Sequence, residues 1–597
     1  MISVSPRGQH DDRLTKLYRD SNKDANKKAP HAAPKRHAEP LCLLFDDYDS
    51  IPKHCLNISH PIFLVKSPHS RYDRRMQSNT LTIPDEIAAV INRLVKAGHK
   101  SYIVGGCVRD ILRGAEPKDW DVATSAKPEE IVALFPESFY ENAFLTVTVR
   151  TGSSVPELAE VEITTFRREG KYTDKRHPDT VAFAETLEED LARRDFTINA
   201  LALSEVEGSG VEAMAMAIPP SSIPASPIPN PPIPGYILID PFDGQNDLRQ
   251  KLIRCVGDPA ERFAEDALRM IRAVRFAAEL DFIIEEKTRT AICENAGLLE
   301  FIAKERIRDE LYKILSSTRA RQGVELLHDL GALKYILPEL EEGIGVENRP
   351  KIFTIWEHNL KALEYGATHN FPLDVRIAAL LHDVGKPRTK GPMKNNEWTF
   401  YGHDVVGGKM TNRALARLRA SREQTEKIAL LIRWHLFKYD MDRDDVVTTD
   451  SSIRRLIRRV GAGNMPDLVK LRICDRMGMG VPKAVPYRLR HFQFRVEKIL
   501  REEEAPGPKM LTINGDDIMA TLDIGPGQRI GRIIEVLLQE TIDDPSANTR
   551  DALLRRVREI GTLSDEELER MARAAEEKVE MIEDERIGRI KQKYYVK

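Results

Sequence analysis

The sequence has few cysteines, and none of them are closely spaced. Its six cysteines lie far apart along 597 residues and form no CxxC motif. Disulfide-stabilised secreted domains and thiolate zinc sites use denser or paired cysteines, so we expect neither in this chain. A reducing cytoplasm is the compartment that fits this cysteine usage best.

Long apolar runs and a strong net charge are also absent. No run approaches the roughly 18 apolar residues that span a bilayer, and the N-terminus lacks the charged-then-apolar pattern of a signal peptide. The net charge is −3, with 31% charged and 41% hydrophobic residues, which is typical of a soluble multidomain protein. A nucleic-acid-binding surface would therefore have to be a local basic patch.

Changes in composition along the chain predict its organisation. Residues 1–75 are polar and rich in Lys, Arg, Asp, His and Pro, so we expect a mostly disordered extension, unless Met76 is the true start. Order is expected from Met76, where a helical pattern ends at Gly98 and SYIVGG follows as a buried strand. The dense prolines of 217–235 predict an extended surface insertion within a domain. After Gly257 the pattern is almost wholly helical.

Two carboxylates follow a glycine turn in the segment IVGGCVRDILRGAEPKDWDVATSA. Asp119 and Asp121 are two residues apart, so in an extended strand their side chains point to one face and could meet one pair of divalent cations. Magnesium prefers oxygen ligands, and two ions about 4 Å apart can polarise an attacking hydroxyl and stabilise a leaving pyrophosphate. The Gly105-Gly106 turn lets backbone N–H groups approach a triphosphate closely.

A DxD motif alone is more typical of a solvated turn, and the preceding glycine turn is what favours a metal site here. The strand expected in VEITTFRREG could bring Glu162 to the same metals as a third carboxylate. A cross-strand surface charge explains Glu162 equally well. The sequence leaves both interpretations of this residue open.

Eight motifs occur in an order that resembles one enzyme family: GGCVRD, DWDVATSAKPEEI, TVTV, VEITTFR, RHPDTV, RRDFTINALAL, DPFDGQNDL and EDALRMIRAVRF. From about residue 81 to 280 the chain resembles the class II nucleotidyltransferases, which include the tRNA CCA-adding enzymes and bacterial poly(A) polymerases. The resemblance continues more loosely through the helical remainder. It implies that the catalytic metal ligands are Asp119 and Asp121, and that the triphosphate contacts are Gly105, Gly106 and Arg109.

The segment RRDFTINA resembles the sugar-recognition motif of that family. The resemblance implies that the ribose hydroxyls are read by Arg194, Asp195 and Asn199. A carboxylate and an amide can accept from and donate to a vicinal diol, which agrees with this role. Asp195 could instead be the N-cap of a helix. Asp110 is expected to cap a helix or to pair with an arginine rather than to bind metal.

The stretch EDALRMIRAVRF has the apolar spacing of a buried helix and an arginine at every third position. Cytosine and adenine both present an exocyclic amino group beside a ring-nitrogen acceptor. On one helical face Asp266 could accept from that amino group while Arg269 donates to the ring nitrogen, and the resemblance implies this role. Glu265, Arg272 and Arg275 are expected to brace the pair. A solvated or salt-bridged helix is the alternative.

A second set of histidines and aspartates lies in WEHNLKAL, AALLHDVGKP, YGHDVVGG, IRWHLFK and RICDRMG. A buried His-Asp pair is costly unless a cation or partners satisfy it, and imidazole with carboxylate suits a divalent transition metal better than calcium. The order resembles the HD phosphohydrolase superfamily. The resemblance implies four metal ligands, His358, His382, Asp383 and Asp475. Two further residues would serve a second ion or phosphate, His403 and His435.

Clustered positive charge marks three segments of the helical half, SIRRLIRRVG, YRLRHFQFRVEK and DALLRRVREIG. They could track the phosphates of a tRNA acceptor stem, although such runs are usually solvated helix faces. The N–H groups at the start of the helix in GPGQRIGRIIEVLL could also meet phosphate, and an ordinary capped helix is equally consistent.

Together these features predict an α+β fold with an N-terminal head and an all-helical remainder. We expect a nucleotidyltransferase head with a small mixed sheet (76–256), a helical neck (257–340), an HD domain (341–500) and an RNA-binding helical tail (501–597). The expected reaction is transfer of CMP, CMP and AMP from CTP and ATP to a tRNA 3′ end, with magnesium in the transferase site and a transition metal in the HD site. No membrane is expected to be involved, and the sequence does not indicate an oligomeric state.

Two features bear on which nucleotides are added. Bacterial poly(A) polymerases carry a GRRFRLxHV-like strand where this chain has FLTVTVR, and GKYTDKRHPDT resembles the flexible loop of enzymes that complete CCA. Full CCA addition is therefore favoured over CC-only, A-only or poly(A) synthesis. The HD domain could hydrolyse a phosphomonoester or cyclic phosphate to clear a damaged 3′ end, or be retained without activity. The remaining alternative is an RNA-processing HD hydrolase with an inactive transferase.

Overall fold

The structure is a computed structural model, and it describes residues 83–141, 146–169, 181–206, 233, 235–349, 353–395, 397–439, 448–480, 485–504 and 510–596. The predicted extension at 1–75, most of the proline-rich insertion at 217–235 and the segment GKYTDKRHPDT lie outside these residues. The described residues all fall within Asn79–Lys597, which forms one unit by its internal contacts. None of the described helices combines the length and hydropathy that a membrane-spanning helix requires.

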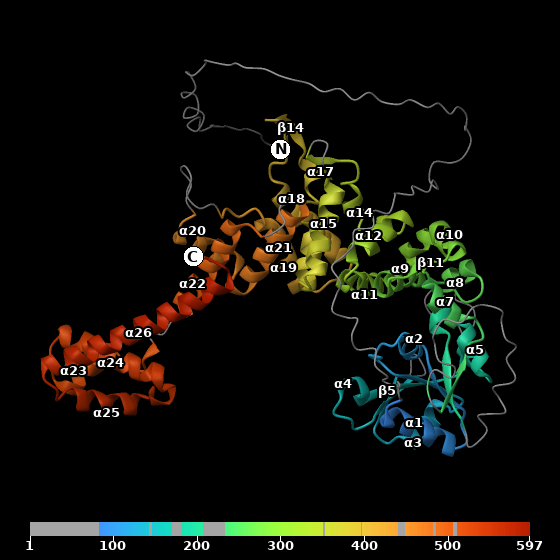
Figure 1. The fold of residues 1–597 in the computed structure, drawn as a ribbon, viewed down its shortest axis with the longest axis horizontal. Helices are drawn as coiled ribbons and strands as arrows, with labels where there is room; N and C mark the ends of the chain where they lie inside the picture. Colours follow the sequence, from blue (N-terminus) through green and yellow to red (C-terminus); the bar gives the residue numbers. More distant parts are fainter. Residues whose placement is uncertain are drawn as a thin grey trace, which may run out of the picture. The chain divides into compact units, whose positions relative to one another are not determined.

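The head is built on a seven-stranded mixed sheet in the order β3-β4-β5-β2-β1-β8-β9 (Figure 1). Within it β2 and β5 pair in parallel, and the other neighbours pair antiparallel. The strands are β1 (Ser101–Val104), β2 (Asp121–Thr124), β3 (Ser138–Glu141), β4 (Thr146–Arg150), β5 (Glu160–Thr165), β8 (Ala202–Glu205) and β9 (Tyr236–Ile239). A two-stranded sheet is formed by β6 (Arg167–Glu169) and β7 (Val181–Phe183).

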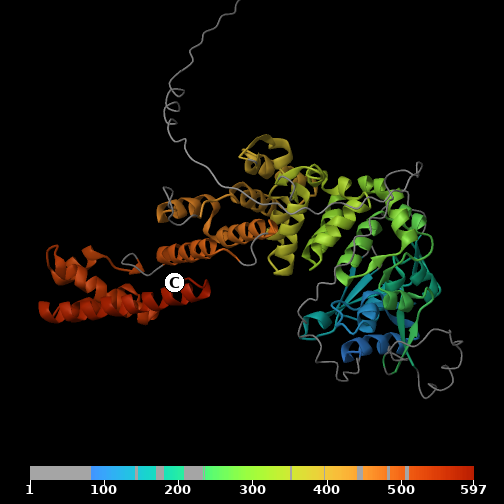
Figure 2. The same cartoon turned by 45° about the horizontal axis from the view of Figure 1, so that its top comes forward.

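Alternation along the central strands gives the sheet two apolar faces. Ile103 and Val122 pack with α1 in one buried cluster, whereas Val104 and Ala123 pack with α5 in another. In both ribbon views α1 and α3 lie together beside the strands (Figures 1 and 2). The head helices are α1 (Asp85–Lys96), α2 (Gly106–Leu112), α3 (Pro128–Leu134), α4 (Pro156–Ala159), α5 (Leu187–Ala192), the 3₁₀ turn η1 (Thr197–Asn199) and α7 (Gly244–Gln250).

The remainder of the described chain is helical, with three pairs of short strands along it. The neck contains α8 (Pro259–Glu265), α9 (Leu268–Leu280), α10 (Glu286–Asn295), η2 (Ala296–Phe301), α11 (Lys304–Ser316), α12 (Ala320–Asp329), α13 (Leu333–Ile336) and α14 (Pro338–Glu341). The strand pairs are β10 (Leu252–Ile253) with β11 (Ile283–Ile284), β12 (Glu347–Arg349) with β13 (Phe353–Thr354), and β14 (Gly391–Lys394) with β15 (Glu397–Thr399), besides β6 with β7.

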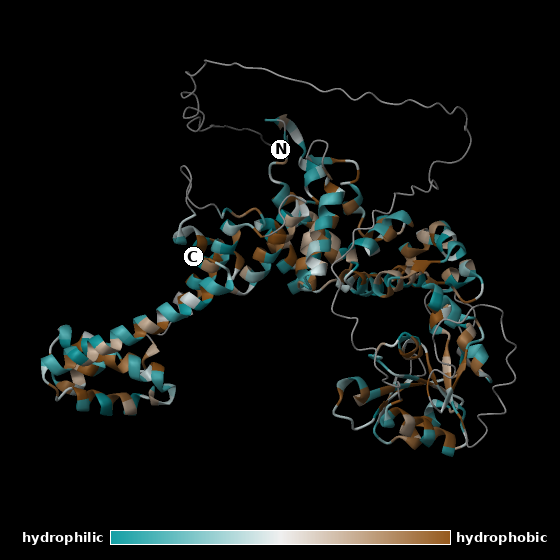
Figure 3. Ribbon diagram, viewed as in Figure 1, coloured by the Kyte–Doolittle hydropathy of each residue, from teal (hydrophilic) through white to brown (hydrophobic). Residues whose placement is uncertain are grey.

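Twelve further helices follow the neck. They are α15 (Ile355–Thr368), α16 (Leu373–Leu381), α17 (Lys386–Thr389), α18 (His403–Arg417), α19 (Arg422–Trp434), α20 (Asp450–Val460), α21 (Met465–Gly478), α22 (Tyr487–Glu504), α23 (Gly515–Leu522), α24 (Gln528–Asp543), α25 (Arg550–Ile560) and α26 (Asp565–Lys593). Short 3₁₀ turns, η3 (Ala462–Asn464) and η5 (Pro545–Ala547), lie between them. Apolar and polar residues alternate along these helices (Figure 3), and the last four share a separate apolar core. The predicted α+β fold class is confirmed.

The predicted single helix EDALRMIRAVRF is wrong, because the structure breaks it at Asp266. Helix α8 ends at Glu265 and α9 begins at Leu268. Asp266 between them is extended, with φ −141° and ψ 101°, and its carboxylate accepts a hydrogen bond from the Leu268 N–H. A short carboxylate that bonds the backbone two residues ahead competes with helical pairing, which explains the break.

Candidate active site and metal centre

The glycine turn before α2 places Gly105 against two predicted site residues. Its φ is 83°, in the left-handed region that favours glycine. A Cβ at this position would lie 2.7 Å from Nη1 of Arg194 and 3.3 Å from Oδ2 of Asp121. Only glycine fits there. Because both atoms are so close, the glycine turn, the Arg194 guanidinium and the Asp121 carboxylate belong to one site. Arg194 is the cation beside the predicted metal ligand.

The two aspartates of the DxD motif lie at the start of β2. The strand begins at Asp121, so Asp119 lies in the preceding bend and not in the strand as predicted. Trp120 between them is buried, while Asp119 is exposed and Asp121 is half-buried. Burial raises the pKa of Asp121, Arg194 opposes this and the Asp119 carboxylate adds to it. A divalent cation would relieve that repulsion.

Glu162 is the register partner of Asp121 in the parallel β2–β5 pair. Paired residues on neighbouring strands face the same side of a sheet, so Glu162 lies on the side of the DxD carboxylates. In the part of the chain that the structure describes, both groups of three ligand atoms within 4.8 Å of one another belong to the HD domain. A role for Glu162 at the metal therefore stays a prediction.

The predicted ribose-reading residues form a buried hydrogen-bond network. Asp195 accepts from Nδ2 of Asn199 at 3.2 Å and from Arg272 at 2.7 Å, and Asn199 accepts from Nη1 of Arg109 at 2.8 Å. Burial acts to raise the pKa of Asp195, but Arg272 and Arg269 outweigh it and hold the pKa below its ordinary value. The alternative role as an N-cap is not supported, because a 3₁₀ turn without a side-chain cap follows.

Arg109, a predicted triphosphate contact, lies beside Gly106 with its guanidinium bound inside the protein. It donates to both carboxylate oxygens of Asp110 at 2.9 Å and packs over the ring of Phe276 at 5.3 Å. Asp110 also binds Arg113 at 3.2 Å, so it pairs with arginines as expected. Arg109 thereby connects α2 to the neck helix α9.

Asp266 and Arg269 have separate partners and do not share one helical face as predicted. Arg306 donates two hydrogen bonds to the Asp266 carboxylate, at 2.7 and 3.3 Å. Arg269 binds Glu265 at 2.6 Å and donates to the carbonyl of Arg193 at 3.1 Å. Arg306 of α11 therefore fixes Asp266, whereas Glu265, four residues earlier, and the Arg193 carbonyl fix Arg269.

The other arginines of α9 act as braces between elements. Arg272 binds Asp195, and Arg275 binds Glu310 at 3.2 Å on the neighbouring helix α11. Sequence reasoning missed Arg306 and Glu310, which lie four residues apart on α11 and face α9. The sequence signal that could have revealed them is a pair of charged residues on the inward side of an amphipathic helix.

Six predicted metal-binding residues converge in the HD domain from five places in the chain. His358 lies in α15, His382 and Asp383 at the end of α16, His403 at the start of α18, His435 at the end of α19 and Asp475 in α21. All six are buried, with at most 6% exposed. The structure thus brings together every HD residue that the sequence predicted.

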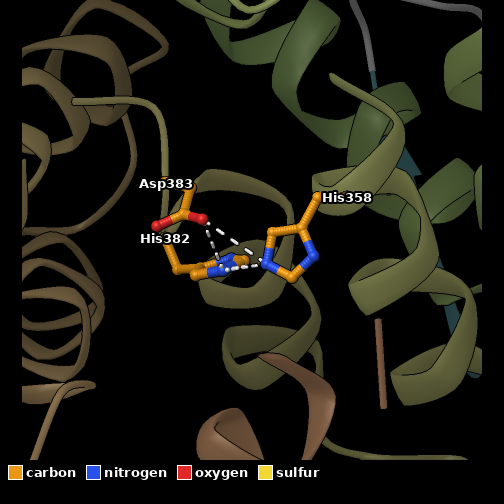
Figure 4. Close-up of side chains that lie close together, drawn as sticks. All are labelled: His358, His382 and Asp383. Atoms are coloured by element: carbon orange, nitrogen blue, oxygen red, sulfur yellow. Dashed lines mark hydrogen bonds and ion pairs between the residues drawn. The ribbon is translucent and has the colours of Figure 1, made fainter. Parts of the chain in front are cut away.

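Ligand atoms in this cluster form two groups that share Asp383. In the first group Nε2 of His358 lies 3.0 Å from Nε2 of His382 and 3.4 Å from Oδ2 of Asp383 (Figure 4). The second group consists of Asp383 with His403 and His435, whose Nε2 atoms lie 3.4 and 3.8 Å from Oδ1. The Asp475 carboxylate completes the first group, 3.3 Å from His358.

Three of the histidines are oriented by the same backbone contact. Nδ1 of His382, His403 and His435 lies 2.6 to 2.8 Å from the carbonyl oxygen three residues earlier. A proton on Nδ1 leaves Nε2 as the acceptor, which is the tautomer that a metal requires. Oδ1 of Asp383 is buried without a hydrogen-bond donor, which adds to the fit of a cation.

The electrostatics of the cluster favour positive charge. Burial acts to lower the pKa of His382, but Asp383 and Asp475 outweigh it and raise the pKa to about 10. Burial and the neighbouring His382 lower the pKa of His435 to about 3, so its imidazole is neutral. Lys386 binds Asp383 and Arg472 binds Asp475, both at 2.5 Å. These imidazole and carboxylate groups fit a divalent transition metal.

Comparison with known proteins covers the same regions. Family models match at residues 101–254 ("Poly A polymerase head domain"), 281–344 ("Probable RNA and SrmB- binding site of polymerase A") and 355–477 ("HD domain"). The CCA-adding enzyme of Enterococcus faecalis is 30% identical over 486 residues, which cover 79% of this chain and 96% of that protein. The chain belongs to the tRNA nucleotidyltransferase and poly(A) polymerase family.

Other members of this family give similar matches. The A-adding tRNA nucleotidyltransferase of Deinococcus radiodurans is 31% identical over 73% of this chain and 90% of its own length. A CCA-adding enzyme of Lactococcus lactis is 45% identical over 44% of this chain, and the match spans only 58% of that relative. The solved CCA-adding enzyme of Bacillus stearothermophilus, in complex with CTP, aligns with 79% of this chain and 96% of its own at a TM-score of 0.48 and 24% identity.

The lowered pKa of Asp195 predicts a pH-dependent contribution to stability. Such a carboxylate stabilises the fold above its unfolded pKa of about 4, and the contribution is lost as the pH falls through the folded pKa. We expect Asp195→Asn to lower the free energy of unfolding by about 2 kcal/mol at neutral pH. The difference from wild type should shrink below about pH 4 in urea titrations that follow the unfolding of the head by tryptophan fluorescence, with Trp356, Trp398 and Trp434 replaced by Phe in both proteins.

Asp281→Asn is the matched control, because Asp281 is exposed and binds only Arg319 among the described side chains. Its effect should stay below about 1 kcal/mol at every pH. If Asp195→Asn lowers the free energy of unfolding equally at neutral and acidic pH, the assignment of Asp195 as an ionised carboxylate is contradicted.

Proposed function

We propose that this protein adds CCA to tRNA 3′ ends from CTP and ATP. The observation that carries the proposal is the site formed by Gly105, Arg194 and the DxD carboxylates. Cys107, Cys255 and Cys474 are free thiols, which supports a cytoplasmic location.

The head residues have separate tasks in this reaction. Asp119 and Asp121 would hold magnesium, which supplies charge stabilisation for the attacking hydroxyl and for the leaving pyrophosphate. The glycine turn offers backbone N–H groups, and Arg194 beside it offers a guanidinium, to the triphosphate. Asp195 and Asn199 would read the ribose hydroxyls as a fixed pair, because Arg272 and Arg109 bind them.

Base selection would use Asp266 and Arg269. Each carboxylate oxygen has two acceptor sites, so Asp266 can keep its bonds to Arg306 while it accepts from the amino group of cytosine or adenine. Arg269 would donate to the ring nitrogen from a position fixed by Glu265 and the Arg193 carbonyl. Guanine and uracil lack this donor and acceptor pattern and would leave the two side chains unpaired.

Addition of A alone is the second candidate, because the Deinococcus radiodurans relative that covers 73% of this chain is named an A-adding tRNA nucleotidyltransferase. The two functions differ in substrate. A CCA-adding enzyme extends a tRNA that lacks all three nucleotides, whereas an A-adding enzyme extends only a tRNA that already ends in CC.

The decisive assay uses purified protein, magnesium and labelled CTP or ATP, separately and together, with tRNA that lacks CCA and with tRNA ending in CC. We expect three nucleotides on the first tRNA and one on the second. Asp119→Asn should reduce both rates at least about a hundredfold, because an amide supports bound cations poorly. A long A tract, or extension of the second tRNA alone, would contradict CCA addition, and an active Asp119→Asn would contradict the metal assignment.

Substitution at the base-selecting pair should relax specificity. With Asp266→Ala or Arg269→Ala, we expect discrimination of CTP and ATP against UTP and GTP to fall by about ten- to a hundredfold, because each lost base contact removes part of the preference. Single-nucleotide incorporation measures this ratio. Asp309→Ala, which removes an exposed carboxylate of α11, should leave the ratio unchanged. A uniform loss of rate with unchanged ratios would exclude base selection by these residues.

The HD cluster would hydrolyse a phosphomonoester or cyclic phosphate, an activity that could clear damaged 3′ ends. Bound to His358, His382, Asp383 and Asp475, a transition metal would supply an activated water. With 2′,3′-cyclic AMP and manganese, nickel, cobalt or zinc, we expect turnover that His382→Ala abolishes without loss of nucleotide incorporation. The exposed His369, tested as His369→Ala, is the matched control. Turnover that survives in His382→Ala, or none with any metal, would refute this activity.

A further inference from the structure

A cavity of about 640 Å³ lies between α19, α20 and α22, and neither candidate site uses it. Its walls come from the end of α19, from one side of α20 between Ser452 and Arg459, and from Phe492 of α22, with Asp404 of α18 at one edge. These four helices lie in the same part of the ribbon (Figure 1). The volume falls within the range of about 300 to 1,000 Å³ that is typical of small-molecule sites.

Aromatic rings form one side of this cavity. Phe437 and Phe492 stack on one another with their centroids 4.7 Å apart, and Phe437 is buried. Trp434 is half-buried, and the guanidinium carbons of Arg433 and Arg459 each lie 5.2 Å from its ring. Aromatic rings and guanidinium planes are the groups on which unstacked bases pack in nucleic-acid-binding proteins.

The cavity is also strongly cationic. Four cations and one carboxylate line it, and that carboxylate, Asp404, is bound by Arg433. The other three, Lys438, Arg455 and Arg459, have no carboxylate partner among the residues that the structure describes. Uncompensated cations around an enclosed space favour an anionic occupant.

We propose that this cavity binds a nucleoside phosphate. The base packs against Trp434, and the phosphate lies between Arg455 and Arg459, which are one helical turn apart on α20. An acidic peptide would satisfy the cations but would leave the aromatic wall without a planar partner. The same chemistry is present in a free mononucleotide and in a single-stranded RNA end, and binding experiments can separate these two sources.

The elements that form the cavity also carry the metal cluster. Trp434 precedes His435 at the end of α19, and Asp404 follows His403 at the start of α18. The side chains of these neighbours point in different directions, because successive residues are rotated about the helix axis: the histidines enter the cluster, whereas Trp434 and Asp404 line the cavity. An occupant of the cavity would therefore be held by the same two helix ends that position the second group of metal ligands.

The test is the quenching of Trp434 fluorescence, taken as the difference between the wild-type protein and Trp434→Phe. The full chain is titrated with AMP and, separately, with a single-stranded pentaadenylate RNA. We expect saturable quenching, with affinity about tenfold weaker in Arg455→Gln and in Arg459→Gln. Arg458→Gln is the matched control, because Arg458 is an exposed arginine of the same helix outside the cavity.

Each outcome has a defined meaning. Quenching by AMP assigns the site to free nucleotides, and quenching by the pentaadenylate alone assigns it to RNA ends. No quenching by either, or an equal loss of affinity in Arg458→Gln, would overturn the proposal. Circular dichroism and CCA addition report folding of each variant. Trp434 and the cavity belong to α18, α19, α20 and α22, which carry none of the residues proposed for nucleotide transfer. A negative result at Trp434 would therefore leave the proposed transferase function untouched.

Discussion

The head and the neck depend on one buried carboxylate, that of Asp195. An ionised group in the interior is costly unless charge and hydrogen bonds compensate it. Here the compensation comes from Asn199 on the same segment and from Arg272 on α9. Through Asn199 the network reaches Arg109 in α2, and through Arg272 it reaches Glu310 in α11. A single charge thus aligns the glycine turn, the ribose-reading segment and the neck.

The HD cluster also contains buried carboxylates, and their charge is compensated in a different way. Three of the four imidazoles around its buried carboxylates are oriented locally, by the carbonyl oxygen three residues earlier. Because these three helix ends orient their own histidines, they can converge on the cluster without a shared loop. Burial acts to raise the pKa of the two aspartates, but the neighbouring histidines, together with Lys386 and Arg472 at the edges, outweigh it and hold both pKa values well below the ordinary value. This local orientation leaves the Nε2 atoms free to point inward.

Local patterns in the sequence predicted much of this arrangement. The glycine turn, the helix that ends before Gly98 and the gathering of the HD residues follow from short-range preferences or from motif order. The partners of the α9 arginines did not follow, because Arg306 and Glu310 come from a helix some forty residues away and their pairing depends on tertiary packing. The break at Asp266 was missed for a related reason: its side chain bonds the backbone locally, which helical periodicity does not reveal.

The contacts of helix α9 have a mechanical consequence. The helix binds the predicted ribose-reading segment at two points, because Arg269 donates to the Arg193 carbonyl and Arg272 donates to Asp195. A tilt of α9 would therefore move that segment with it, so the residues proposed to read the base and the sugar form one rigid unit. Under the proposed function, the difference in size between a pyrimidine and a purine must then be accommodated elsewhere, on the side of the nucleotide that faces the primer.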